Sequence, residues 1–281
     1  MLAFIGGTGI YSIDDIAVVE EVIVETPFGT PSGSIVRGRW NEHEVLFLAR
    51  HGAGHRLLPH EINYRANIFA LKGLGATQLV SLSAVGSLDE AIAPGHLALP
   101  GQYFDWTRGK RDASFFGAGV AGHISSAEPV SGELASWIAR GADSLGLTCH
   151  SNVTYAGVEG PRLGTCAESH FLRQAGCQIV GMTNVPEAFL AREAQICYAS
   201  IGMVTDYDCW MDNPEMHVKA TEIFALYGQS IGKAIELLQH LMQTPLPAEE
   251  IEIRQALAVS ILTPDSALSE QQRQWLDILR R

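Results

Sequence analysis

Residues 196–208, ICYASIGMVTDYD, place two carboxylates directly after a long apolar run. The run from Ile196 to Met203 is rich in residues that favour β-structure, so it predicts a buried strand. Side chains alternate along a strand, and this alternation places Asp206 and Asp208 on one face, a few ångströms apart. The segment therefore predicts a strand at the centre of the fold, with a pair of acids at its end.

Two like charges that close cannot both ionise cheaply at the edge of a core. One of the two carboxyls is expected to have a raised pKa and to hold a proton near neutral pH. A protonated acid beside a charged acceptor matches the edge of a 6-aminopurine, which needs a proton at one atom and offers an amino hydrogen at the next. The plainer interpretation is a solvated turn, because Asp is common in loops, and the segment taken alone favours that interpretation.

Strands alternate with helical stretches for most of the 281 residues, which predicts an α/β fold with a mixed, largely parallel twisted sheet flanked by helices. No repeat or long linker divides the chain, so we expect one domain over residues 1–281, with 245–281 as a C-terminal helical extension. The expected strands are 2–6, several within 20–49, 78–83, 97–100, 148–158, 178–183 and 196–203. The expected helices are 59–73, 131–145, 166–175, 185–194, 215–241 and 248–262.

Composition excludes several classes of protein. Apolar residues make up 47% of the chain and charged residues 18%, which is enough apolar material for a sizeable core. The net charge of −12 argues against partners that are nucleic acids or anionic membranes. It leaves room for one small anion, which backbone amides and a few Arg or His side chains can bind locally.

The cysteines and histidines also limit the classes of function that are possible. Five scattered cysteines without C-x-x-C spacing fit reduced thiols in a cytoplasmic protein. The ten histidines show no metal-ligand spacing, so no metal site is expected. The N-terminus shows neither a signal peptide nor a transmembrane segment, which agrees with a cytoplasmic location.

Three expected strands end in segments suited to binding an anion. GGTG at 6–9 lets backbone N–H groups and the Thr8 hydroxyl approach an anion, and RHG at 50–52 offers the planar guanidinium of Arg50. SAVGS at 83–87 supplies small residues and hydroxyls. Each segment alone is more simply a tight turn or a surface pair. Together they predict convergence on one phosphate, since open α/β sheets bind ligands at strand ends.

Further segments carry weaker signals. EGPR at 159–162 is a candidate pocket wall, and Met182 can pack against a sugar at the end of another strand. The pattern G-x-S-x-G at 228–232 suggests a serine hydrolase, but it lies in a helical stretch with no preceding strand. Ser230 is therefore not expected to be a nucleophile.

Taken together and in order, the motifs resemble those of the purine nucleoside phosphorylase family, specifically its methylthioadenosine phosphorylases. The motifs are GGTGIY at 6–11, TPFG at 26–29, LARHG at 48–52, NYRANIFALK at 63–72, SAVGSL at 83–88, EGPR at 159–162, AES at 167–169, MTNVPEAFLAREAQICYASI at 182–201 and TDYDCW at 205–210. The resemblance implies a homotrimeric α/β enzyme with an active site near a subunit interface. It implies attack of phosphate, as co-substrate and without a cofactor, on C1′ of 5′-methylthioadenosine, giving adenine and 5-methylthioribose 1-phosphate.

The resemblance also implies roles for residues that match the family's positions. The residues that match its phosphate-binding positions are Thr8, Arg50, His51, Ser83, Ala84 and Thr183. For the nucleoside, the implied residues are Met182, Asp206, Asp208, Ala84, Leu163 and Gly164. Around the 5′ substituent they are Val218 and Ala220, together with His123 from a neighbouring subunit. Asp206, protonated, is expected to donate to purine N7 as the base leaves. Asp208, ionised, is expected to orient the exocyclic amine.

The chain departs from the family pattern at a few positions. Ser83 stands where a Thr is expected, and Leu163-Gly164 replaces an aromatic residue and a Ser of the animal enzymes. Relatives that act on 6-oxopurines carry Asn, so the pair Asp206 and Asp208 favours 6-aminopurines. A phosphorylase for adenosine or for 6-oxopurine nucleosides such as methylthioinosine stays an alternative, as does a non-catalytic nucleoside-binding relative.

Overall fold

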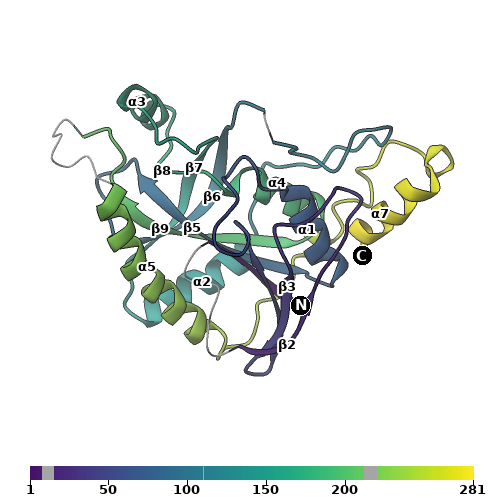
Figure 1. Cartoon of the computed structure of the whole chain (residues 1–281), viewed down its shortest axis with the longest axis horizontal. Helices are drawn as coiled ribbons and strands as arrows, with labels where there is room; N and C mark the ends of the chain where they lie inside the picture. Colours follow the sequence, from purple (N-terminus) through teal and green to yellow (C-terminus); the bar gives the residue numbers. More distant parts are fainter. Residues whose placement is uncertain (8–15, 110, 212–219) are drawn as a thin grey trace.

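The apolar run at 197–206 forms the buried strand β9, Cys197–Asp206, in the middle of a nine-stranded sheet (Figure 1). The computed structural model describes residues 1–7, 16–109, 111–211 and 220–281. The strands are β1 (Leu2–Gly6), β2 (Ala17–Val22), β3 (Ile35–Trp40), β4 (His43–Ala49), β5 (Gln78–Ser87), β6 (Leu97–Trp106), β7 (Cys149–Val158), β8 (Ile179–Gly181) and β9. The helices are α1 (Tyr64–Gly73), α2 (Gly132–Ser144), α3 (Cys166–Gln174), α4 (Asn184–Glu193), α5 (Ala220–Leu241), α6 (Ile251–Arg254), the 3-10 turn η2 (Asp265–Ala267) and α7 (Glu270–Arg280).

The sheet order β2-β3-β4-β1-β5-β8-β7-β6-β9 closes on itself because β5 also pairs with β9. β5 pairs in parallel with β1 and β9, and its end pairs antiparallel with β8. β8, β7 and β6 are parallel to one another, and β6 returns antiparallel to β9. Five strands therefore form a ring, and the parallel strands β4, β1, β5 and β9 bring their carboxyl ends to one edge. The mixed, largely parallel sheet agrees with the prediction.

Helices cover the sheet in two groups (Figure 1). On one side α1, α4 and α7 contribute Ile68, Leu190 and Trp275 to one hydrophobic cluster. On the other side α2 and α5 contribute Leu134 and Leu237 to a second cluster. The prediction of a sheet covered on both faces is confirmed.

Several predicted boundaries differ from the structure. The helix expected at 59–73 begins at Tyr64, because Asn63 caps it by accepting a hydrogen bond from the Ala66 N–H at 3.1 Å. The strand expected at 97–100 continues to Trp106, with shifts of register around Pro100. Of the helix expected at 215–241, residues 220–241 form α5, and 215–219 lie outside the described residues.

The helix predicted at 248–262 is wrong beyond its first turn. Only Ile251–Arg254 is helical, and the chain continues in turns. The Leu257 N–H donates at 2.8 Å to the side-chain oxygen of Gln195 rather than to a carbonyl one turn back. A tertiary contact has replaced a helical hydrogen bond, which local sequence does not reveal.

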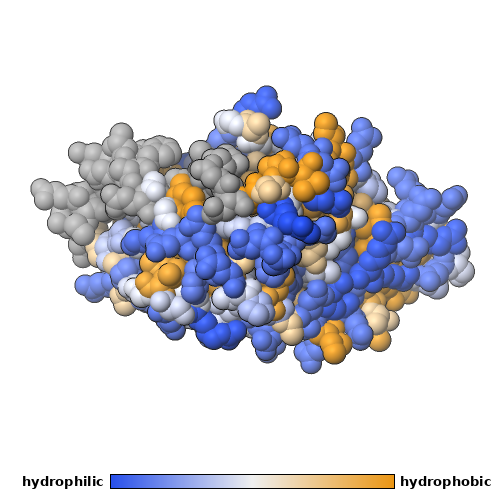
Figure 2. Space-filling view, turned by 90° about the horizontal axis from the view of Figure 1, so that it is seen from below, coloured by the Kyte–Doolittle hydropathy of each residue, from blue (hydrophilic) through white to orange (hydrophobic). Residues whose placement is uncertain are grey.

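The described surface and interior show neither a membrane span nor a metal cluster. None of the described helices is long and apolar enough to cross a membrane. Within the same residues, no three His, Cys, Asp or Glu side chains gather as metal ligands would. Figure 2 shows a largely hydrophilic face on which hydrophobic residues form small separate groups.

Candidate active site

The two carboxylates lie together at the carboxyl end of β9. Asp206 is the last residue of the strand, and its Oδ2 accepts a hydrogen bond from the Asp208 N–H at 2.9 Å. Asp208 has φ of +52°, so the chain has already turned out of the strand. The predicted closeness is confirmed, but alternation along a strand is the wrong reason for it, because the turn brings Asp208 back. Opposite the pair stands Gly86, where a Cβ would lie 3.2 Å from Asp206 Oδ2.

Asp206 has a raised pKa, as predicted for one member of the pair. Burial of the carboxyl is the largest cause, and the neighbouring charge of Asp208 adds less. Hydrogen bonds from the Thr205 hydroxyl and the Asp208 N–H act against this rise. The sequence argument had rested on the like charges, whereas loss of solvation has the larger effect.

The hydroxyl of Thr205 lies between two acceptors, one of which is the carboxyl of Asp206. Its oxygen lies 2.6 Å from Asp206 Oδ1 and 3.3 Å from the carbonyl oxygen of Val85. A hydroxyl carries one hydrogen and can donate to one of the two acceptors only. The shorter contact makes Asp206 the main acceptor, and this donated hydrogen bond opposes the rise in the pKa of Asp206.

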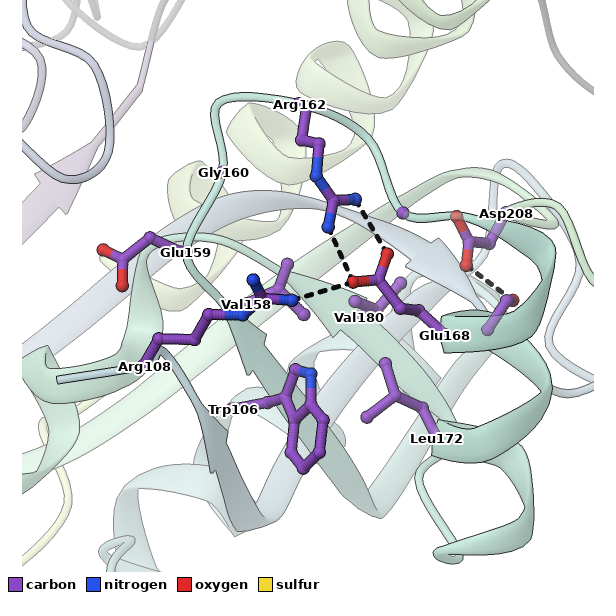
Figure 3. A pocket seen from close by; sticks show the side chains of 12 residues that line it. Trp106, Arg108, Val158, Glu159, Gly160, Arg162, Glu168, Leu172, Val180 and Asp208 are labelled. Carbon is purple, nitrogen blue, oxygen red and sulfur yellow. Dashed lines mark hydrogen bonds and ion pairs between the residues drawn. The ribbon is translucent and has the colours of Figure 1, made fainter. Parts of the chain in front are cut away.

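Asp208 lines a pocket of about 190 Å³ between the ends of β7, β6 and helix α3. Its Oδ2 accepts a hydrogen bond from the Ser169 hydroxyl at 2.6 Å, and Figure 3 marks a bond of Asp208 by a dashed line. Gly160 and Gly164 also line the pocket. At its mouth, Figure 3 shows Arg162 and Arg108 converging on Glu168, with the closest contacts at 2.6 and 3.2 Å respectively.

Met182 lies at the end of β8, directly beside Gly160. A Cβ at Gly160, whose φ is +67°, would lie 2.5 Å from the Met182 sulfur, so this contact requires glycine. The buried guanidinium of Arg111 donates to the carbonyl oxygens of Met182 and Glu159, both at 2.7 Å. Arg111 therefore holds the ends of β7 and β8 together. Sequence reasoning missed it, because an arginine in a loop carries no pattern of its own.

Arg50 follows β4, but its guanidinium points into the protein. The side chain is 1% exposed and bonds to the Glu187 carboxylate through Nε at 2.8 Å and through Nη2 at 3.1 Å. It also donates to the Ser81 hydroxyl at 2.6 Å and to the Leu82 carbonyl at 2.9 Å. The planar fork that was expected to face phosphate faces Glu187. Of its five N–H donors, four bond to described residues, and the fifth, on Nη1, makes no hydrogen bond to any of them.

His51 is a neutral histidine whose tautomer is fixed by its surroundings. Its Nδ1 lies 2.9 Å from the carbonyl oxygen of Leu57, and a carbonyl only accepts, so Nδ1 carries the hydrogen. Burial, followed by the charge of Arg50, lowers the pKa of His51 to about 4. Its ring stacks on that of His55 with centroids 4.1 Å apart. The other ring nitrogen, Nε2, is consequently an acceptor at neutral pH.

The β5 and α4 segments approach each other behind this edge. The Ser83 hydroxyl donates to Asn184 Oδ1 at 2.8 Å, and Thr183 is the N-cap residue of α4. Thr183 makes no side-chain capping bond, so its hydroxyl is not used to close the helix. Ala84 is exposed between the buried residues Ser83 and Val85, which opens β5 to a ligand at this point.

The remaining candidates are dispersed or lie outside the described residues. Thr8 and Val218 lie outside them, and Ala220 begins α5, where its side chain is not described. Leu163 is 58% exposed. His123 is exposed between β6 and α2 and is not among the residues that line the described pocket. Ser230 is buried inside α5, without the strand and turn of a hydrolase nucleophile.

Comparison with known proteins identifies relatives along the whole chain. Residues 2–242 match the family model of the phosphorylase superfamily. The chain is 41% identical over 279 residues to an S-methyl-5′-thioadenosine phosphorylase of Geobacter sulfurreducens, which covers 99% of this chain and 97% of that protein. It is 46% identical over 242 residues to the enzyme of that name from Nitrosopumilus maritimus, covering 86% and 90% of the two chains.

Solved structures agree with the sequence relatives. A methylthioadenosine phosphorylase from an Antarctic soil metagenomic library superposes with a TM-score of 0.91 at 40% identity, over 99% of this chain and 98% of that one. A methylthioadenosine phosphorylase of Schistosoma mansoni in complex with adenine gives a TM-score of 0.82 at 33% identity, over 86% and 90% of the chains. The fold is thus similar to that of methylthioadenosine phosphorylases, and the Schistosoma structure holds adenine.

Proposed function

Because the chain belongs to the phosphorylase superfamily, we propose that it catalyses phosphorolysis of 5′-methylthioadenosine. Phosphate attacks C1′ of the nucleoside, the glycosidic bond breaks, and the products are adenine and 5-methylthioribose 1-phosphate. Inorganic phosphate is the co-substrate, and the reaction needs no cofactor. The observation that carries the proposal is the half-buried Asp206, with its raised pKa, beside Asp208 at the carboxyl end of β9.

The departing purine requires a proton, and Asp206 is suited to provide it. Because burial raises the pKa of Asp206, its carboxyl keeps a proton to a higher pH than an exposed aspartate does. In the proposed reaction Asp206 transfers this proton to N7 as the bond to C1′ breaks. The positive charge that develops on the ribose is stabilised by the anionic phosphate below C1′.

Asp208 favours a 6-aminopurine over a 6-oxopurine. A carboxylate accepts hydrogen bonds, so it matches the exocyclic amine of adenine and opposes the carbonyl oxygen of hypoxanthine. The Ser169 hydroxyl already donates to one oxygen of Asp208, which helps to keep the carboxylate ionised. Gly164 lies beside this carboxylate and leaves space for the base.

We place the phosphate at the edge where β1, β4, β5 and β8 end, near Thr8, Arg50, His51, Ser83, Ala84 and Thr183. The neutral His51 offers an acceptor there, which suits a phosphate that still carries a proton. The Ser83 hydroxyl donates to Asn184 and must turn away from it to donate to phosphate. Met182 then packs against the ribose between the two parts of the site.

Two further aspects of the proposal concern the assembly and its location. We propose a homotrimer in which His123 of one subunit reaches the 5′ substituent in its neighbour's site. His123 is exposed in its own chain, as this arrangement requires. A cytoplasmic location is supported by five cysteines that are all free thiols.

The test is release of free base from 5′-methylthioadenosine, adenosine and inosine, each with and without phosphate. We expect adenine release that depends on phosphate, fastest with 5′-methylthioadenosine and negligible with inosine. Base release without phosphate would instead identify a hydrolase. Binding without turnover would identify a nucleoside-binding protein, and faster release from inosine would reverse the role given to Asp208.

A further inference from the structure

We infer that Glu187 is a positioning residue for phosphate, which acts by orienting Arg50 and by joining it to the other strand-end segments through a buried hydrogen-bond network. The network consists of Arg50, Ser81, Ser83, Asn184, Glu187 and Tyr198. The inference rests on the proposed phosphorolysis and adds residues that no strand-end motif contains.

The carboxylate of Glu187 accepts four hydrogen bonds, which come from Arg50, Ser81 and Tyr198. Its Oε2 accepts from Arg50 Nε at 2.8 Å. Its Oε1 accepts from Arg50 Nη2 at 3.1 Å, from the Ser81 hydroxyl at 2.6 Å and from the Tyr198 hydroxyl at 3.0 Å. A carboxylate accepts on both oxygens, whereas the amide of Gln has one oxygen and an NH₂ group that only donates, so Gln cannot accept all four of these hydrogen bonds.

The network continues from Tyr198 to β5. Asn184 Nδ2 donates to the Tyr198 oxygen at 2.9 Å, so Asn184 Oδ1 is free to accept from the Ser83 hydroxyl at 2.8 Å. Each hydroxyl in this series donates once, and each donation points towards Glu187. The carboxylate therefore sets the direction of hydrogen bonds as far as Ser83.

Three segments of the proposed phosphate site each contain or adjoin a member of the network. Arg50 precedes His51, Ser83 precedes Ala84, and Asn184 follows Thr183 in the chain. The network members Arg50, Glu187 and Tyr198 are each 1% exposed, so most of the network lies below the surface of the proposed site.

Burial restricts the orientation of the Arg50 guanidinium. A guanidinium taken out of water is tolerated only with a well-placed carboxylate and further hydrogen bonds. Arg50 has both, and its four contacts fix the plane of the guanidinium and hence the position of the remaining Nη1 hydrogen. A phosphate that uses this donor depends on Glu187 without touching it.

The variant that tests the inference is Glu187→Gln. The amide places an N–H group against donors of Arg50, Ser81 or Tyr198, which displaces the guanidinium. We expect KM for phosphate to rise by roughly tenfold or more, because small misplacement of a binding group is costly. KM for 5′-methylthioadenosine should change by less than about threefold, because the nucleoside binds to other residues. A defect in folding alone would lower the amount of active protein and leave both KM values unchanged.

Glu193→Gln is the matched control on the same helix. Glu193 is also a largely buried carboxyl of α4, but it accepts from the Ser114 hydroxyl at 2.8 Å and the Phe115 N–H at 2.7 Å, outside the network. We expect both KM values of this variant to equal those of the wild type.

A second variant keeps the inference testable if Glu187→Gln does not fold. Tyr198→Phe removes one hydroxyl from the network and preserves the ring that packs in the core. It should raise KM for phosphate severalfold and leave KM for the nucleoside unchanged. The inference is overturned if the folded variants keep the wild-type KM for phosphate, if that KM falls, or if both KM values rise together. Absence of phosphate-dependent turnover in the wild type would refute the proposed function itself, which separates the two failures.

Discussion

At the scale of single residues, the chemistry of this site depends on what burial does to a carboxyl. Asp206 lies at the end of a buried strand, where loss of solvation raises its pKa. The contacts from Thr205 and Asp208 oppose that rise without cancelling it. The balance leaves a carboxyl that keeps its proton to a higher pH than an exposed aspartate does, beside a second carboxyl, and the proposed reaction of a 6-aminopurine uses this combination.

The first prediction concerns that proton. Asp206→Asn retains the shape of the side chain but has no acidic proton to transfer. We expect kcat for 5′-methylthioadenosine at saturating phosphate to fall by about a hundredfold or more. Asp112→Asn, at a position whose side chain is 73% exposed, should keep wild-type kcat. If Asp206→Asn stays within about threefold of the wild type, another group protonates the base.

At the scale of elements, the buried strands and their ends were predictable, and the contacts that orient them were not. The run ending in Asp206 indicated a buried strand with a carboxylate pair, because apolar periodicity is a local signal. The partners of Arg50 were not predictable, since Glu187 lies 137 residues away. The role of Arg111 was not predictable either, because this residue lies in a loop without a sequence pattern and reaches the Met182 carbonyl through a tertiary contact. Sequence thus indicates which residues reach the edge of the sheet, whereas tertiary contacts determine their direction.

The end of α4 provides a prediction about pH. Burial raises the pKa of Glu193 from 4.5 to about 7, against the hydrogen bonds from Phe115 and Ser114. The folded protein therefore binds this proton more tightly than the unfolded chain, and wild-type stability decreases as pH rises through about 7. Glu193→Gln does not titrate, so its stability relative to the wild type should increase by roughly 2 kcal/mol between about pH 5 and about pH 8. Urea denaturation at the two pH values measures this, and a difference that does not change with pH would contradict it.

Helix α2 depends on a residue of the C-terminal extension. Glu250 Oε1 accepts from the N–H groups of Gly132 and Glu133 at 2.8 and 3.3 Å, and Oε2 accepts from the Ser131 hydroxyl. These N–H groups have no partner within the helix, and a carboxylate at a helix N-terminus is stabilising. Glu250→Ala should lower the free energy of unfolding by about 1 kcal/mol in urea denaturation. Glu252→Ala, at an exposed position of α6, is the control, and an equal loss in both variants would exclude the capping role.

At the scale of the whole molecule, the extension after residue 245 belongs to the core of its own chain. Trp275, Leu276 and Leu279 of α7 are buried in the cluster that includes Ile68 of α1. The family model ends at residue 242, whereas the alignment with the Geobacter relative spans 279 residues, so the extension is shared with that enzyme.

The last prediction tests whether the site is completed by a neighbouring subunit. His123→Ala and Asp206→Asn should each be poorly active alone. If His123 serves its neighbour's site, co-expressed chains assemble trimers in which about a quarter of the sites have both residues intact, and activity with 5′-methylthioadenosine returns to that level. If His123 serves its own chain, every site lacks one residue and mixing restores nothing. Light scattering of the purified mixture establishes that it is trimeric, so a monomeric protein would contradict the shared site independently of activity. Restoration of activity in a trimer would place the 5′ substituent at the subunit boundary, because no site within a single chain of either variant holds both His123 and Asp206.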